Sequence, residues 1–186
     1  MLKETFGYYC TLSHTPFSQA KEMVVAALEE EGFSVITEID MKVILKEKLN
    51  LDFRNYLILG ACNPNLASLA LVAEPHAGLM LPCNVVIQDR MGADGVVVSL
   101  QNPKALSTLV DNERLDAIAQ VAEARIHKVL ERLGAMETSE EDPDLESVGS
   151  ISESQYPGKG LKKLFANRRE LLSGIRDHYP SEGLNI

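Results

Sequence analysis

The sequence contains no tryptophan, and aromatic residues make up only 5% of its 186 residues. It has three cysteines, Cys10, Cys62 and Cys83. An odd and small number of cysteines does not suit a disulfide framework, which small secreted domains use to replace a hydrophobic core. We therefore expect reduced thiols and a reducing compartment.

Long apolar runs are also missing. The longest are short, such as residues 67–73, which include Ser68. None approaches the roughly 20 apolar residues that cross a bilayer. The first ten residues, MLKETFGYYC, lack an apolar core followed by a cleavage site of small residues, the pattern of a signal peptide. We expect a cytoplasmic protein that does not associate with membranes.

Basic residues are outnumbered, with 18 Lys and Arg against 27 Asp and Glu, for a formal net charge of −9. Nonspecific nucleic-acid binding requires a basic face that displaces counterions. We therefore expect no nucleic-acid partner. Hydrophobic residues reach 45% of the chain, which is typical of a globular protein and excludes a fully disordered one.

The composition changes near residue 136 and divides the chain into three parts. Residues 137–146 contain six acids and no base, and all six bases of residues 137–186 lie between Lys159 and Arg176. So polar a stretch buries little surface. The sequence predicts a folded domain over 1–136, an acidic linker over 137–160 and an amphipathic helical tail over 161–186.

Strands and helices alternate along residues 1–136. Strands are expected at 5–12, 34–39, 54–61, 79–88 and 96–100, because β-branched or aromatic residues dominate there. Helices are expected after Thr15-Pro16, from Met41 to Leu49, after Asn63-Pro64, after Pro103 and after Asn112, since a capping side chain or an early proline precedes most of them. Gly32 and Gly134 are expected to end two of these helices. This order, with a hairpin at 91–95, favours the α+β class with an antiparallel sheet.

Two segments carry a family resemblance, LILGACNP at 57–64 and LMLPCNVVI at 79–87. Together with a third segment, EEGFSVITEIDMKVILKEKL, they indicate a resemblance to domain-of-unknown-function family 302. The resemblance covers residues of about 2–132. The resemblance implies a TATA-binding-protein-like domain, in which helices back an antiparallel sheet, and a homodimer. That family has no established activity, so the resemblance carries a fold but no reaction, and the cofactor stays unknown.

Two Cys-Asn dipeptides are the candidate site: Cys62-Asn63 at the end of one strand and Cys83-Asn84 near the start of another. If these strands are antiparallel neighbours, the two dipeptides meet at one end of the sheet. Cys62 then lies just before a helix N-terminus, which favours an anion and lowers a thiol pKa. The same residues also fit a structural role, with buried thiols and Asn63 as a helix cap.

Three functions remain open from the sequence. The first is a noncatalytic homodimeric domain that binds a small ligand or a protein partner, because no complete catalytic motif occurs. The second is a thiol-dependent protein that handles redox equivalents, sulfur or a soft metal through Cys62 and Cys83. The third is an anion-responsive regulator that uses the basic tail. No metal-ligand spacing is present, and whether the protein is an enzyme stays open.

Overall fold

The computed structural model describes residues 7–134, so the expected linker at 137–160 and tail at 161–186 lie outside the described residues. The described chain belongs to two compact units. One contains residues 7–41 and 54–134, and the described part of the other is Lys42–Phe53. The second unit carries most of helix α2 (Met41–Leu49). Lys46 of this helix pairs with Asp52, which follows it, at 2.6 Å.

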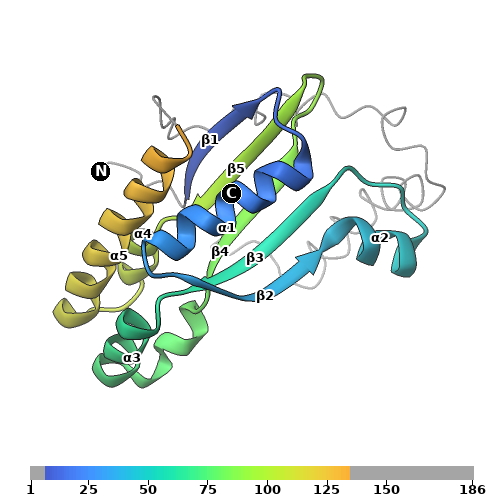
Figure 1. Cartoon of the computed structure of the whole chain (residues 1–186). Helices are drawn as coiled ribbons and strands as arrows, with labels where there is room; N and C mark the ends of the chain where they lie inside the picture. Colours follow the sequence, from blue (N-terminus) through green and yellow to red (C-terminus); the bar gives the residue numbers. More distant parts are fainter. Residues whose placement is uncertain (1–6, 135–186) are drawn as a thin grey trace, which may run out of the picture. The chain divides into compact units, whose positions relative to one another are not determined.

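A five-stranded antiparallel sheet forms the first unit (Figure 1). Its strands are β1 (Gly7–Ser13), β2 (Ser34–Asp40), β3 (Tyr56–Cys62), β4 (Cys83–Asp89) and β5 (Gly95–Gln101). They lie in the order β1-β5-β4-β3-β2, so β1 and β2 are the two edges. The antiparallel sheet and the α+β class predicted from the sequence are confirmed. β3 lies inside the sheet, as its apolar residues on both faces predicted.

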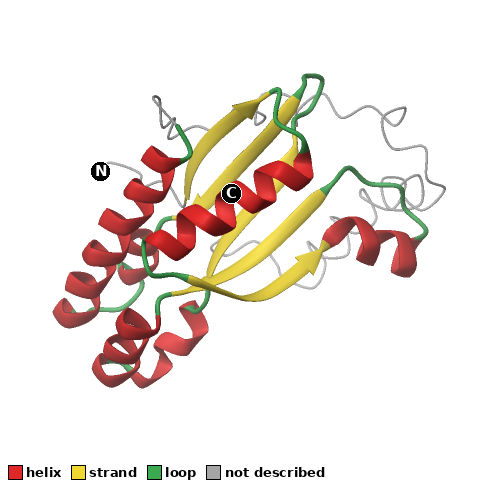
Figure 2. Cartoon of the chain, viewed as in Figure 1, coloured by secondary structure: helices red, strands yellow, loops and turns green. Residues whose placement is uncertain are grey.

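Helices α1 (Phe17–Glu30) and α5 (Glu113–Arg132) cover one face of this sheet (Figure 2). Alternate residues of each strand point toward them, as the period of two in a strand requires. Val85, Val98 and Leu59 from the sheet join Leu28 and Ile126 from the helices in one core, and none of them is exposed. This shared core therefore holds α1 and α5 against the sheet.

Three shorter helices lie near the end of the sheet at which β3 ends: α3 (Pro64–Ala73), the 3-10 helix η1 (Pro75–Met80) and α4 (Pro103–Ser107). Ala70, Ala77 and Leu115 form a second, smaller core there, which joins α3 and η1 to the start of α5. The Asn112 side chain adds a hydrogen bond to the Ala73 carbonyl at 3.1 Å. These contacts hold α3 against α5.

Helix starts show how local chemistry sets the boundaries. Asn63 and Asn112 cap α3 and α5, as predicted, through side-chain oxygens that accept backbone N–H groups. The predicted cap at Thr15 is wrong, because α1 begins at Phe17 and the Thr15 hydroxyl instead donates to the Ser13 carbonyl. Gly32 and Gly134 follow their helices with φ of 78° and 74°, values that glycine adopts without strain.

The predicted strand over 79–88 is too long at its start. Residues Pro75–Met80 form η1, and β4 begins only at Cys83. Proline has no backbone N–H and cannot donate to a sheet ladder, so Pro75 and Pro82 favour a helical turn and a late strand start. This difference matters because η1 becomes one wall of the pocket described below.

Candidate functional site

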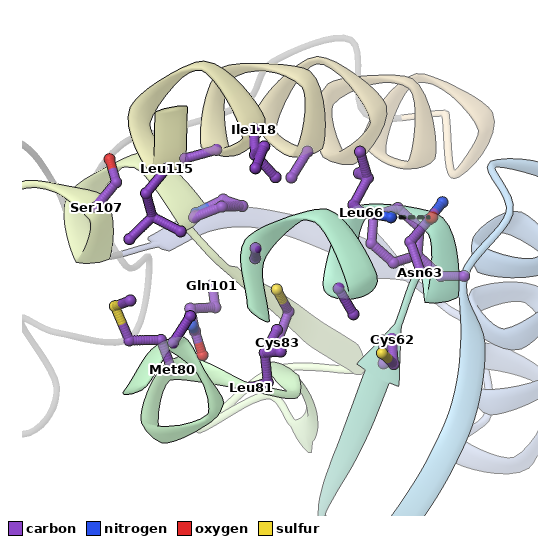
Figure 3. A pocket seen from close by; sticks show the side chains of 18 residues that line it. Cys62, Asn63, Leu66, Met80, Leu81, Cys83, Gln101, Ser107, Leu115 and Ile118 are labelled. Atoms are coloured by element: carbon purple, nitrogen blue, oxygen red, sulfur yellow. Dashed lines mark hydrogen bonds between the residues drawn. The ribbon is translucent and has the colours of Figure 1, made fainter. Parts of the chain in front are cut away.

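A pocket of about 70 Å³ opens at the end of the sheet where β3 leads into α3 and β4 begins (Figure 3). It lies within the first unit. Apolar side chains from α3, η1 and α5 form most of its wall, among them Leu66, Ala70, Met80, Leu115 and Ile118. The pocket therefore presents mainly carbon to whatever enters it.

The structure brings the two Cys-Asn dipeptides together. In the β3–β4 ladder Ala61 is opposite Cys83 and Gly60 is opposite Asn84, so the predicted antiparallel neighbours are confirmed. Both Cys62 and Cys83 line the pocket. Figure 3 shows the Cys83 sulfur directed toward α3, with Cys62 at the tip of β3. The candidate residues Cys62 and Cys83 thus lie at one end of the pocket.

The two asparagines have different positions. Asn63 lines the pocket and is 7% exposed, and its Oδ1 accepts the Leu66 N–H at 3.2 Å. The predicted capping role of Asn63 is therefore confirmed. Asn84 is exposed and is not among the residues lining the pocket. Its backbone N–H donates to Gln101 Oε1 at 3.0 Å.

Burial makes Cys83 a poor acid. The loss of hydration, together with the neighbouring Cys62, raises the pKa of its thiol to about 11. At neutral pH the Cys83 side chain is therefore a neutral thiol. A neutral thiol is a weak nucleophile and packs as a small apolar group.

Gln101 and Ser107 are pocket residues that the sequence did not single out. Gln101 Oε1 accepts the backbone N–H of Asn84, the second residue of β4. Ser107 is buried, and its Oγ lies 2.9 Å from the Lys104 carbonyl and 3.1 Å from Asp116 Oδ1. Neither residue belongs to a recognisable motif, so the sequence gives no signal for its place in the pocket. They line the pocket because β5, α4 and α5 meet there.

The polar side chains around the pocket already have partners inside the protein. Within residues 7–134 no buried side-chain nitrogen or oxygen lacks a hydrogen bond. Nor do the described residues contain a group of three or more His, Cys, Asp or Glu side chains able to hold a metal ion. From Gly7 to Gly134, Cys62 and Cys83 thus have no third ligand of these types to join them.

Two histidines outside the pocket pack differently from one another. The ring of His127 on α5 lies 4.5 Å from the ring of Tyr8 on β1, centroid to centroid. The Tyr8 hydroxyl also donates to Glu123. His14 directly follows β1 and pairs with the exposed Asp94 at 2.9 Å. Both arrangements join separate segments of the fold.

The comparisons with known proteins agree with this architecture. The chain belongs to the family described as domain of unknown function DUF302, whose model matches residues 8–133. It is similar to the crystal structure of an uncharacterised conserved DUF302 protein from Bacillus stearothermophilus. The identity is 29%, the TM-score is 0.63, and the match covers 69% of this chain and 98% of that one. No curated protein matches.

The family resemblance seen in the sequence is therefore confirmed, and with it the antiparallel sheet with helices on one side. No helix in the described part of the chain is long and apolar enough to cross a membrane. The family carries no assigned reaction in its description. Function must therefore be argued from the pocket itself.

Proposed function

We propose that the protein is a noncatalytic, homodimeric cytoplasmic domain that binds a small ligand by enclosing a short apolar group of that ligand. The observation that carries this proposal is the pocket between α3, η1 and α5, with its mainly apolar wall. A well-formed apolar pocket with few polar groups is the usual form of a small-molecule site.

The pocket chemistry supports binding rather than catalysis. Among the described residues, its lining contains no Asp, Glu, His, Lys or Arg. General acid–base catalysis needs a titratable group close to the reacting atoms. Asn63, Gln101 and Ser107 are the polar non-thiol side chains of the lining, and each has a hydrogen-bond partner or capping role in the protein. Apolar contact is therefore the main interaction that the pocket offers.

The pocket size limits the ligand group. Its volume of about 70 Å³ is under half of the roughly 150 Å³ cavity that admits a benzene ring. A branched aliphatic group of roughly three or four carbons fits that space better than a ring does. Longer or polar parts of a ligand would remain outside the mouth of the pocket.

The proposal can be tested with isobutanol as a probe that carries such a group. In protein labelled with ¹³C at the methionine methyls, isobutanol should shift the Met80 signal in a saturable way. An affinity of roughly millimolar strength is expected for so few atoms. The signals of Met23 and Met91, which do not line the pocket, should remain nearly unchanged.

Filling the pocket provides the matched comparison. Ala119 lines the pocket, whereas Ala117 on the same helix is exposed. Ala119→Leu should abolish the saturable Met80 shift, and Ala117→Leu should retain it. Thermal unfolding and circular dichroism would verify that both variants fold. A folded wild-type protein without a saturable Met80 shift, or equal binding by folded Ala119→Leu, would contradict the proposal.

A thiol-dependent function remains a second candidate, since two thiols line the same pocket. It would use Cys62 and Cys83 for redox chemistry, sulfur handling or a soft metal. The raised pKa of Cys83 weakens this candidate, because the reactive species is the thiolate. The decisive measurement is the rate of alkylation at Cys62 and Cys83 as a function of pH.

A further inference from the structure

One amide group in the pocket wall has an oxygen with a partner and a nitrogen without one. Gln101 ends β5 and lines the pocket, and its Oε1 accepts the Asn84 N–H at 3.0 Å. Because only the oxygen of an amide can accept this N–H, the bond fixes the orientation of the group. No described residue accepts a hydrogen bond from Gln101 Nε2. This nitrogen therefore has two N–H donors that a ligand can use.

The other polar non-thiol side chains of the wall do not offer such a donor. The Nδ2 atom of Asn63 lies beside Gly32, because a Cβ added to Gly32 would be 3.1 Å from it. The hydroxyl of Ser107 has a single hydrogen, and two oxygen atoms of the protein lie within hydrogen-bond distance of it. Gln101 therefore supplies the available donor of the pocket.

The surroundings of the pocket favour a neutral ligand. Among the described residues the lining has no base that could pair with an anion. The Asp116 carboxylate lies 3.1 Å from the Ser107 hydroxyl, so it would repel an anionic group on that side of the pocket. An ammonium group would lose its hydration among mainly apolar side chains, which is costly. A neutral oxygen avoids both costs and can accept a hydrogen bond.

We propose that the ligand is a neutral ketone or ester, whose carbonyl oxygen accepts a hydrogen bond from Gln101 Nε2 while its short branched alkyl group fills the pocket. The inference rests on the proposed function and names the class of ligand and the residue that selects it. A ketone or ester has an acceptor and no donor. It therefore brings no N–H or O–H group that would lack a partner among the apolar side chains.

The donor is held in place before a ligand arrives. Gln101 pairs with Gly7 in the β1–β5 ladder, and the bond from Asn84 ties its side chain to β4. In Figure 3 the Gln101 amide lies on the same side of the pocket as Met80. A side chain that is already ordered loses little rotational freedom on binding. The amide can therefore select for an acceptor at small entropic cost.

The test compares 3-methyl-2-butanone with isobutanol, the probe of the proposed function. The ketone can only accept a hydrogen bond, whereas the hydroxyl of isobutanol can accept or donate one. Gln101→Glu keeps an oxygen for the Asn84 N–H and replaces the donor nitrogen with a second acceptor. In the Met80 titration this variant should weaken ketone binding by about three- to tenfold relative to isobutanol. Gln19→Glu adds the same charge at an exposed position of α1 outside the lining and should leave the ratio unchanged.

A second measurement uses the wild type alone. In ¹⁵N-labelled protein the ketone should shift the side-chain NH₂ signals of Gln101 in a saturable way. These signals decide the question if circular dichroism and thermal unfolding show that Gln101→Glu does not fold.

The outcomes separate the ligand class from the site itself. Isobutanol binding combined with an unchanged ratio in folded Gln101→Glu, or with Gln101 NH₂ signals that the ketone does not move, would overturn the carbonyl ligand and leave the apolar site. If neither probe gives a saturable Met80 shift in the wild type, the proposed function fails as well.

Discussion

Cys83 illustrates how its surroundings decide the chemistry of one residue. The thiol lies where β4 begins, close to the chain end of β3, and apolar side chains of the pocket surround it. Removing a thiolate from water is costly, so burial raises the pKa of Cys83 to about 11. A cysteine in a sequence motif thus becomes mainly a packing residue at neutral pH.

Alkylation measures this effect at a single residue. At pH 8, a shift from 9.0 to about 11 lowers the thiolate fraction roughly 100-fold. A more basic thiolate is also more nucleophilic, which offsets part of the loss. We therefore expect iodoacetamide to modify Cys83 about 10- to 100-fold more slowly than free N-acetylcysteine, as followed by mass spectrometry of each cysteine.

The pH profile separates a raised pKa from simple steric protection. With a raised pKa, the rate at Cys83 should continue to increase up to about pH 11. A rate that levels off at or below pH 9 would contradict the shift and favour the thiol-dependent function. Cys62 is measured in the same spectra, so the experiment also tests the predicted reactivity of the thiol that precedes α3.

At the scale of elements, β3 depends on a glycine at one point of close approach. Gly60 pairs with Thr37 on β2 and with Asn84 on β4. A Cβ at this position would collide with Thr37 Oγ1 and lie 2.7 Å from Pro82 Cγ. The segment before β4 and the neighbouring strand β2 therefore both approach β3 because residue 60 has no side chain.

Gly60→Ala should consequently lower the free energy of unfolding by about 1–3 kcal/mol, the usual cost of overpacking a well-packed position. Chemical denaturation in urea would measure it. Gly78→Ala is the matched control, since its added Cβ would meet only Leu71 Cδ2, at the ordinary distance of 3.7 Å. Adding Thr37→Ala should recover part of the loss. Equal effects at Gly60 and Gly78 would argue against the close approach.

At the scale of the whole molecule, the buried thiol of Cys10 and the half-buried thiol of Cys83 make stability depend on pH. Burial raises the pKa of Cys10 to about 12 and that of Cys83 to about 11, against an ordinary value of 9.0. Unfolding exposes both thiols and restores the ordinary pKa. Between pH 9 and these raised values the unfolded chain has fewer bound protons than the folded one. Stability is therefore complete below pH 9 and falls as pH rises above it.

The contribution of Cys83 can be isolated with Cys83→Ala. The difference in unfolding free energy between wild type and this variant should be constant below pH 9 and shrink between about pH 9 and 11. The expected slope is at most about 1.4 kcal/mol per pH unit. Urea denaturation at several pH values measures it. Cys10→Ala should retain the part of the fall due to Cys83, and a difference independent of pH would refute the shift.

Some elements could be predicted because their signals are local. A capping asparagine and a following proline or apolar stripe define the starts of α3 and α5, and Gly32 marks the end of α1. The late start of β4 was missed because η1 lacks a strong periodic signal, being only six residues long. Thr15 was misassigned because its hydroxyl bonds to Ser13 instead of capping α1.

The sequence alone determined the alternation of strands and helices, the α+β class and the family. These depend on period, turns and capping, which operate over a few neighbouring residues. The pairing of β3 with β4, which brings the two Cys-Asn dipeptides together, belongs to the tertiary structure. The tertiary structure decided which residues enclose the pocket, since β3, β4, α3 and α5 approach one another from distant parts of the chain. It also decided the protonation of Cys83, because desolvation depends on neighbours in space and not on neighbours in sequence.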